Sequence, residues 1–335
     1  MQHSIESFSW GTLADGRAVL LYRLTHRNGM TLEVLNYGGI IRLLEVPDRA
    51  GTFDNVVLGY DNLEDYIYHS PYFGALIGRY ANRIAHGKYM ASNREVQLAV
   101  NHGVHHLHGG HHGFDQVLWD VFPEQTEDTV GLTLRYLSPD GEEGFPGNLA
   151  VEVVYRITDD FCLEICYGAT SDRETVVNLT SHSYFNLSGN FQLPIGNHQL
   201  QLNATEVLEV DHDLIPTGAY ASVNNTPLDF RELRPLGTSK AYDHCFVVQY
   251  GSQKMQHIAS VQEPTSGRLM EVWTNQPGLQ LYTPQSLPKP FVAFGAFCLE
   301  TQNFPDAPNH PHFPSARVSK ENPYRSETHY CFGKF

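Results

Sequence analysis

Apolar and polar residues alternate with a period of two along most of the chain. Val130, Leu132, Leu134 and Tyr136 alternate with glycine, threonine and arginine, and residues 151–155 repeat the pattern. A period of two is typical of a strand that buries one face. The same reasoning predicts strands at residues 18–25, 31–36, 96–100, 161–167, 199–203 and 279–283.

Turn signals separate these runs, and helical periodicity is nearly absent. Asp-Gly, Asn-Gly and Ser-Gly pairs stand at residues 15–16, 28–29, 140–141 and 266–267. The best helical candidate is short, at residues 62–68. Many strands without a strand–helix–strand rhythm indicate an all-β fold, an antiparallel sandwich or barrel with few short helices. No repeat or linker-like segment divides the chain, so we expect residues 1–335 to form a single domain.

Charge limits the partners that the protein can have. The 22 Lys and Arg residues face 37 Asp and Glu residues, which gives a net charge of −15 with neutral histidine. Such an acidic chain lacks the basic surface that binds phosphate backbones, so we expect no nucleic-acid partner.

Residues 1–10 have neither the basic nor the apolar part of a secretory signal, and the longest apolar run, residues 291–299, is too short to span a membrane. We therefore predict a cytoplasmic protein without a membrane partner. The five cysteines contain no C-x-x-C pair, and we expect all of them to be free, buried side chains. They are Cys162, Cys166, Cys245, Cys298 and Cys331.

Two motifs lie in the first third of the chain. Residues 78–84 read Gly-Arg-Tyr-Ala-Asn-Arg-Ile, with arginines four positions apart. Residues 101–112 hold six histidines, which raises the question of a metal site because imidazole is a common metal ligand. Glycines place this run in a loop, and no cysteine or carboxylate lies nearby to complete a site. The composition favours a hydrogen-bonding loop that contacts substrate over a metal centre.

Three motifs in the rest of the chain carry acid–base groups. His182 lies among apolar and hydroxyl residues in the motif 178–187, and Asp243 precedes a histidine between aromatic residues. Glu300 directly follows the apolar run 291–299, which we interpret as a strand. Burial beside such a run would raise the pKa of a carboxyl group toward the range that a general base requires. A histidine near neutral pH is the matching general acid.

The residue types also indicate the ligand. The chain has 18 Tyr, 18 Phe and 18 His residues, with Asn, Gln, Arg and Asp in glycine-rich loops. Aromatic rings contact the C–H faces of a sugar, and amide and charged side chains pair with its hydroxyls. No G-x-G-x-x-G, P-loop or G-x-S-x-G motif is present, so dinucleotide, nucleotide and serine-hydrolase functions have no support.

Taken together and in order, these motifs resemble the aldose 1-epimerases, also called galactose mutarotases. The similarity runs from Asn-Tyr-Gly-Gly at 36–39 to Pro-Asp-Ala-Pro-Asn at 305–309, with Leu-Gly-Tyr at 58–60 and Pro-Gly-Leu-Gln at 277–280 between them. The chain departs from the family in its histidine loop and at Phe304, where tryptophan is frequent. The resemblance implies a large antiparallel β-sandwich, in agreement with the alternation.

The resemblance also implies roles for individual residues. Glu300 matches the general base, His182 the general acid, and His108 a second histidine that binds sugar beside the reacting centre. The other sugar-binding residues that it implies are Asn82, Arg83, Tyr184, Asp243 and Gln280. The implied reaction interconverts the α and β anomers of free aldohexoses such as galactose and glucose by opening and closing the ring. It needs no metal or organic cofactor, and the expected partner is an aldose bound to a monomer or homodimer.

Three alternatives stay open on the sequence alone. A non-catalytic sugar-binding module or sensor would keep the aromatic and hydroxyl-binding residues. A glycoside hydrolase or lyase could use Asp243 and Glu300 as its two carboxylates. A metal-dependent enzyme would use the histidine loop.

Overall fold

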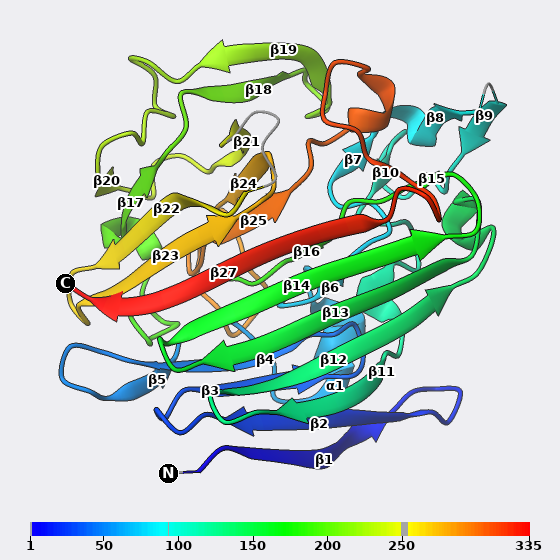
Figure 1. The fold of residues 1–335 in the computed structure, drawn as a ribbon. Coiled ribbons are helices and arrows are strands. Elements are labelled where there is room, and N and C mark those ends of the chain that lie inside the picture. The colour runs from blue at the N-terminus through cyan, green and yellow to red at the C-terminus, as the bar shows by residue number, and fades with distance from the viewer. Residues whose placement is uncertain (1, 93, 249–253) are drawn as a thin grey trace.

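The computed structural model describes residues 2–92, 94–248 and 254–335, and these are built mainly from antiparallel strands (Figure 1). The described part contains a single α-helix, α1 (Leu63–His69), with Asn62 as its N-cap. The remaining helical segments are 3₁₀ turns at Ala85–Gly87, Phe114–Gln116, Glu142–Gly144, Ile195–Asn197 and Ala307–Asn309. The predicted all-β class with few short helices is therefore confirmed. No helix in the described ranges is both long and apolar enough to cross a membrane.

The N-terminal residues form a five-stranded sheet in chain order. Its strands are β1 (Ser4–Thr12), β2 (Ala18–Thr25), β3 (Thr31–Leu35), β4 (Ile41–Pro47) and β5 (Phe53–Asn55). Gly16 and Gly29, in the turns on either side of β2, adopt φ values of 89° and 95°. Glycine enters this left-handed region at little cost, which is why the predicted turn pairs end these strands.

A nine-stranded sheet forms the broadest layer of the molecule (Figure 1). The C-terminal strand lies in its middle, between strands that come from residues 162–171 and 268–274. In spatial order the strands are β11 (Asp120–Gln125), β12 (Thr129–Ser138), β13 (Leu149–Thr158), β14 (Cys162–Ser171), β27 (Tyr324–Lys334), β23 (Arg268–Thr274), β22 (Gln256–Glu263), β17 (Gln199–Leu202) and β20 (Arg234–Pro235).

A second five-stranded sheet and four short strand pairs complete the fold. The sheet is ordered β19 (Pro216–Ser222), β18 (Glu206–Val210), β21 (Asp243–Val247), β24 (Gly278–Tyr282) and β25 (Cys298–Gln302). The pairs join β6 (Leu76–Ile77) to β16 (Thr180–Ser181), β7 (Arg83–Ile84) to β10 (His106–Leu107), β8 (Lys88–Ala91) to β9 (Arg94–Gln97), and β15 (Thr175–Val176) to β26 (Arg317–Val318). Two of these pairs, β6–β16 and β7–β10, bring together motifs that lie far apart in the sequence.

The core lies between the nine-stranded sheet and the strands that cover it. Alternate residues of β12 and β13, including Leu132, Leu134 and Val153, are almost fully buried in one cluster with Leu32 and Leu44 of the N-terminal sheet. This is the face that the period of two predicted. Two predicted strands were wrong in extent: β9 ends at Gln97 instead of reaching residue 100, and the apolar run 291–299 is not a strand before Cys298.

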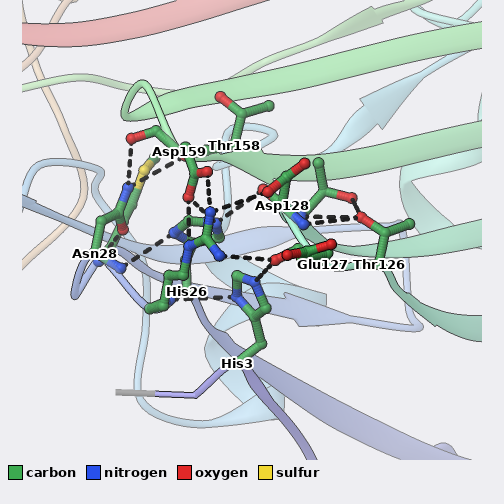
Figure 2. A network of polar contacts seen from close by, with 11 residues as sticks. His3, His26, Asn28, Thr126, Glu127, Asp128, Thr158 and Asp159 are labelled. Carbon is green, nitrogen blue, oxygen red and sulfur yellow. Dashed lines mark hydrogen bonds and ion pairs between the residues drawn. The ribbon is translucent and has the colours of Figure 1, made fainter.

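Some of the histidines outside the predicted site hold turns together. Figure 2 shows His3 and His26 beside the turn after β2, close to Asp128 and Asp159. Nε2 of His26 lies 3.1 Å from the carbonyl oxygen of Asp128, and the Arg27 guanidinium donates to both carboxylates. The network joins the start of the chain to the β11–β12 and β13–β14 turns, so its histidines have a structural role.

The cysteine prediction holds in full only for Cys245 and Cys298, because two cysteines are bonded and the free Cys166 is half-buried. Cys162 and Cys331 form a disulfide, while Cys166, Cys245 and Cys298 are free. Cys162 begins β14 and Cys331 lies directly opposite it on β27, so the antiparallel register places the two side chains together across 169 residues of sequence. No local pattern of cysteines reveals such a register.

Candidate active site

All eight site residues predicted from the sequence line one cavity of about 190 Å³. Pro71, Tyr72, Leu107 and Tyr282 complete its wall. A broader groove of about 930 Å³ crosses the nine-stranded sheet, but none of the predicted residues lines it. The smaller cavity is therefore where the acid–base groups converge.

Glu300 lies in the middle of β25, directly opposite Gln280 on β24. Its side chain is buried, and its Oε2 atom has no hydrogen-bond partner among the described residues. Burial raises the pKa of the Glu300 carboxyl well above its usual value. The nearby Asp243 raises this pKa further, while the Arg83 guanidinium lowers it.

His182 follows β16 directly, and its main chain is fixed from both sides. Its N–H donates to the carbonyl of Ala75, and its own carbonyl accepts from Gly74. The ring Nε2 lies 3.7 Å from Oε1 of Glu300, and Nδ1 lies 3.6 Å from the Cys298 thiol. Burial lowers the pKa of His182 to about 4. The low polarity of the site thus favours the neutral forms of both His182 and Glu300.

His108 directly follows β10 within the histidine loop and has a φ of 51°. Its Nδ1 accepts a hydrogen bond from the backbone N–H of Asn82 at 3.2 Å. Burial and the nearby His182 and Arg83 hold the pKa of His108 well below its usual value, so the ring is neutral. A neutral ring that accepts at Nδ1 carries its proton on Nε2, which makes His108 a hydrogen-bond donor.

Three polar side chains form a connected group in the lining of the cavity. Gln280 donates through Nε2 to Oδ1 of Asp243, and the Arg83 guanidinium lies 3.9 Å from the other carboxylate oxygen. The register of β21 against β24 brings Asp243 and Gln280 within reach. Oε1 of Gln280 and Nε of Arg83 are buried without a partner among the described residues. Such atoms are available to a polar ligand.

The two arginines of the 78–84 motif have different surroundings. Arg79 is 2% exposed and does not line the cavity. Its guanidinium donates to Oγ of Ser138 and to the carbonyls of residues 138, 139, 146 and 147. Arg79 thus anchors the loop between β12 and β13, whereas Arg83 reaches the cavity.

The comparisons with known proteins identify the family. The family model described as aldose 1-epimerase matches residues 20–331. The chain belongs to the aldose 1-epimerase family. It is 41% identical over 343 residues to the galactose mutarotase of Homo sapiens, with 98% of both chains covered. It is 36% identical over 342 residues to the aldose 1-epimerase of Escherichia coli, with 95% of this chain and 96% of the relative covered.

Solved structures give the same result. The galactose 1-epimerase of Lactobacillus acidophilus matches with a TM-score of 0.88 at 25% identity, covering 99% of each chain. An aldose epimerase homologue from C. elegans matches with a TM-score of 0.83 at 28% identity, covering 92% of this chain and 97% of that one. The predicted sandwich and the predicted aldose 1-epimerase function are confirmed, and the comparisons give no support to a non-catalytic sugar-binding module.

The histidine loop of this aldose 1-epimerase is held mainly by hydrogen bonds within the protein. His105 accepts the backbone N–H of His86 at Nδ1, and Nε2 lies 3.4 Å from Asp213. His106 is buried with Nδ1 on the carbonyl of Ala99, and the exposed His111 and His112 donate only their main-chain N–H groups to Glu143. In the described ranges, no group of three His, Cys, Asp or Glu side chains has the arrangement of a metal site.

Sequence reasoning missed three residues that contact the ring of His182 in the aldose 1-epimerase cavity. Tyr72 and Tyr282 line it, and Cys298 contacts His182 from the strand that carries Glu300. Tyr72 stands in a short segment without periodicity. Cys298 follows the strand alternation two residues before Glu300, which places both side chains on the same face of β25. That spacing was the available signal.

Proposed function

We propose that this chain interconverts the α and β anomers of free aldohexoses, with galactose and glucose as substrates, by acid–base ring opening in the cavity. The main support for this proposal is the buried pair of His182 and Glu300. Their side chains lie 3.7 Å apart in a small cavity lined by hydrogen-bonding side chains. Galactose is chosen because relatives such as the human protein are named galactose mutarotases.

The reaction requires two proton transfers. The Glu300 carboxylate takes the proton of the C1 hydroxyl while the His182 imidazolium gives a proton to the ring oxygen. The C1–O5 bond breaks, leaving an open aldehyde, a protonated Glu300 and a neutral His182. Rotation about C1–C2 presents the other face of the carbonyl. The ring oxygen then attacks it and returns its proton to His182, and Glu300 returns its proton to the new C1 hydroxyl.

Burial of the pair favours ring opening. The starting form holds a carboxylate and an imidazolium, whereas the open-chain form holds two neutral side chains. The pKa of Glu300 is raised and that of His182 is lowered, so the site favours the neutral pair that ring opening produces. Arg83 opposes the rise of the Glu300 pKa and so helps to maintain the carboxylate that begins the cycle.

The remaining cavity residues bind the sugar. The Nε2–H of His108 donates to a sugar oxygen beside C1, and the Asp243 carboxylate accepts from sugar hydroxyls. Asn82, Arg83 and Gln280 pair with the other hydroxyls through atoms that have spare hydrogen-bonding capacity. The hydroxyl of Tyr184 is already bound to the carbonyl of Pro71, so this residue contributes its ring.

Anomer-resolved proton NMR tests this proposal. Freshly dissolved α-D-galactose and α-D-glucose, at low buffer concentration, should reach anomeric equilibrium faster with the protein than without it. Methyl α-D-galactoside is the matched control, because it has no free hemiacetal and should stay unchanged. Release of methanol from this control would indicate a hydrolase, and sugar binding without acceleration would contradict the proposed function.

We also propose that residues 1–335 form one domain. One hydrophobic cluster includes residues from Leu24 to Phe332, and the cavity draws on residues from 71 to 300. A single cooperative transition with equal calorimetric and van't Hoff enthalpies would support this, and two resolved transitions would contradict it.

Location and assembly remain predictions. Cytoplasmic location is supported by the free thiols of Cys166, Cys245 and Cys298, but the Cys162–Cys331 disulfide counts against it, because such bonds are rare in reducing compartments. Thiol counting on protein extracted under alkylating conditions, after cell fractionation, addresses both points. Sedimentation equilibrium distinguishes the monomer from the homodimer.

A further inference from the structure

The ring of Tyr72 contacts both histidines of the cavity. Its centroid lies 4.8 Å from that of His108 at an interplanar angle of 60°, and 5.8 Å from that of His182 at 15°. The ring of Tyr184 lies 4.9 Å from that of His182 at 9°. His182 thus lies nearly parallel to two tyrosine rings, and Tyr72 is the one that also reaches His108.

The main chain holds Tyr72 in a defined position. Its φ of 69° lies in the left-handed region, which non-glycine residues seldom adopt. Its carbonyl accepts from the N–H of Ala75, and Oγ of Ser70 accepts from the N–H of Phe73. The hydroxyl of Tyr184 donates to the carbonyl of Pro71, immediately before Tyr72, at 2.9 Å. A hydrogen bond therefore joins the segment that carries Tyr72 to Tyr184, the other tyrosine whose ring stacks on His182.

Tyr72 also lines a second cavity of about 190 Å³. Its other lining residues include the tyrosines at 37 and 66, Ser70, Asp115 and Gln116. None of these five lines the cavity of His182 and Glu300, so the Tyr72 ring is a shared wall between the two spaces. Asp115 gives the second cavity a carboxyl group, and polar atoms make such a space hospitable to water.

We propose that Tyr72 is a positioning residue, whose ring orients His182 and His108 and shields the His182–Glu300 pair from the second, polar cavity. This inference rests on the proposed function. Water beside the pair would stabilise the carboxylate–imidazolium form more than the neutral form. Ring opening converts the first form to the second, so hydration of the site would slow that step.

The groups that face His182 are known from every neighbouring segment. Glu300 and Cys298 face it from β25, and His108 faces it from the histidine loop. The tyrosines that face it are Tyr282 from β24, Tyr72 from the segment before β6, and Tyr184 from the segment after β16. Arg83 and Asp243 act on Glu300. A change in the His182 titration on loss of Tyr72 alone can therefore be assigned to the missing ring.

The test compares Tyr72→Asn, Tyr72→Phe and the control Gln116→Ala. Gln116 lines the second cavity and not that of His182 and Glu300, and its side-chain amide donates to the carbonyl of His111. Asparagine tolerates left-handed backbone, so Tyr72→Asn removes the ring without adding strain. We expect kcat to fall about 10- to 100-fold with KM changed by less than about 3-fold. Tyr72→Phe and Gln116→Ala should stay within about 2-fold of the wild type, because the first keeps the ring and the second leaves it in place.

The titration of His182, followed by ¹⁵N NMR of the sugar-free protein, is the second measurement. In Tyr72→Asn the pKa of His182 should rise toward its usual value of 6.5, and Tyr72→Phe should restore the low value. An unchanged His182 titration with only a raised KM would overturn the inference and make Tyr72 a simple sugar contact. If Tyr72→Asn does not fold, Tyr72→Leu replaces it. A wild type without activity would instead refute the proposed function. The His182 titration can be followed in either case, because it does not require activity.

Discussion

Nε2 of His182 lies 3.7 Å from Oε1 of Glu300, although the two residues are 118 positions apart, one directly after β16 and the other within β25. His182 is positioned by the pairing of β16 with β6, and Glu300 by the pairing of β25 with β24. Both side chains are buried and only 3.7 Å apart, so a charge on one acts strongly on the other. The pair holds one proton in its working state, and the following predictions start from that property.

The rate of anomer interconversion should be bell-shaped in pH. Below the pKa of His182, about 4, Glu300 and His182 are both protonated and the base is lost. Above the raised pKa of Glu300 both are deprotonated and the acid is lost. Asp243 raises the Glu300 pKa, so Asp243→Asn should move the alkaline limb of the profile to lower pH. A limb that stays in place would show that another group sets it.

Substitution of Arg79 should lower the stability of the fold, whereas substitution of Arg83 should lower activity. Arg79→Met leaves buried carbonyls without donors and should lower the free energy of unfolding by about 3 kcal/mol or more. Arg83→Met should leave the unfolding midpoint in denaturant nearly unchanged and reduce kcat about 10- to 100-fold. Urea titration and NMR kinetics on both variants measure the contrast, and equal effects of the two substitutions would contradict it.

Stability should fall as the pH drops from 6.5 toward 4. Nε2 of the buried His198 accepts the N–H of Leu187, and burial lowers its pKa to about 4. A group whose pKa is lower in the folded state stabilises the fold above its unfolded pKa, and this contribution is lost as the pH falls through the folded value. His198→Gln keeps an acceptor but does not titrate. It should reduce the slope of unfolding free energy against pH by up to about 1.4 kcal/mol per unit.

The Cys162–Cys331 disulfide should stabilise the fold without affecting catalysis. The bond closes 169 residues of chain, and neither cysteine lines the cavity. Cys162→Ser should therefore lower the free energy of unfolding by about 2–5 kcal/mol and leave kcat within about 2-fold. Cys166→Ser is the matched control, since Cys166 lies on the same strand with a free thiol. A lower kcat in a Cys162→Ser protein that is fully folded would show that the disulfide affects catalysis, and would contradict this prediction.

The sequence predicted strands well where one face is buried by regular neighbours. β2 spans the predicted residues 18–25, because its alternation and both glycine turns agree. The prediction failed at residues 291–297, where apolar residues fill the core from turns and bends instead of a strand. Apolar character reports burial, but it does not by itself distinguish a strand from a buried irregular segment.

The sequence predicted which residues belong to the site, but not how their side chains are arranged in space. Glu300 and His182 were chosen from local context and from family motifs, and they meet in one cavity. His182 is held by the two-residue pair β6–β16 and Glu300 by the pairing of β24 with β25, and each pairing joins residues that are distant in sequence. The register that opposes Cys162 and Cys331 is equally non-local. A one-dimensional pattern carries no record of such contacts.

The most direct test of the account is the rate at which α-D-galactose reaches anomeric equilibrium with the wild type, Glu300→Gln and His182→Asn. Each substitution should lower kcat by about 10²- to 10⁴-fold, because each removes one of two coupled proton transfers. The double variant should be little slower than either single variant, since the two groups act as a unit. A folded Glu300→Gln enzyme with near wild-type kcat would contradict the account.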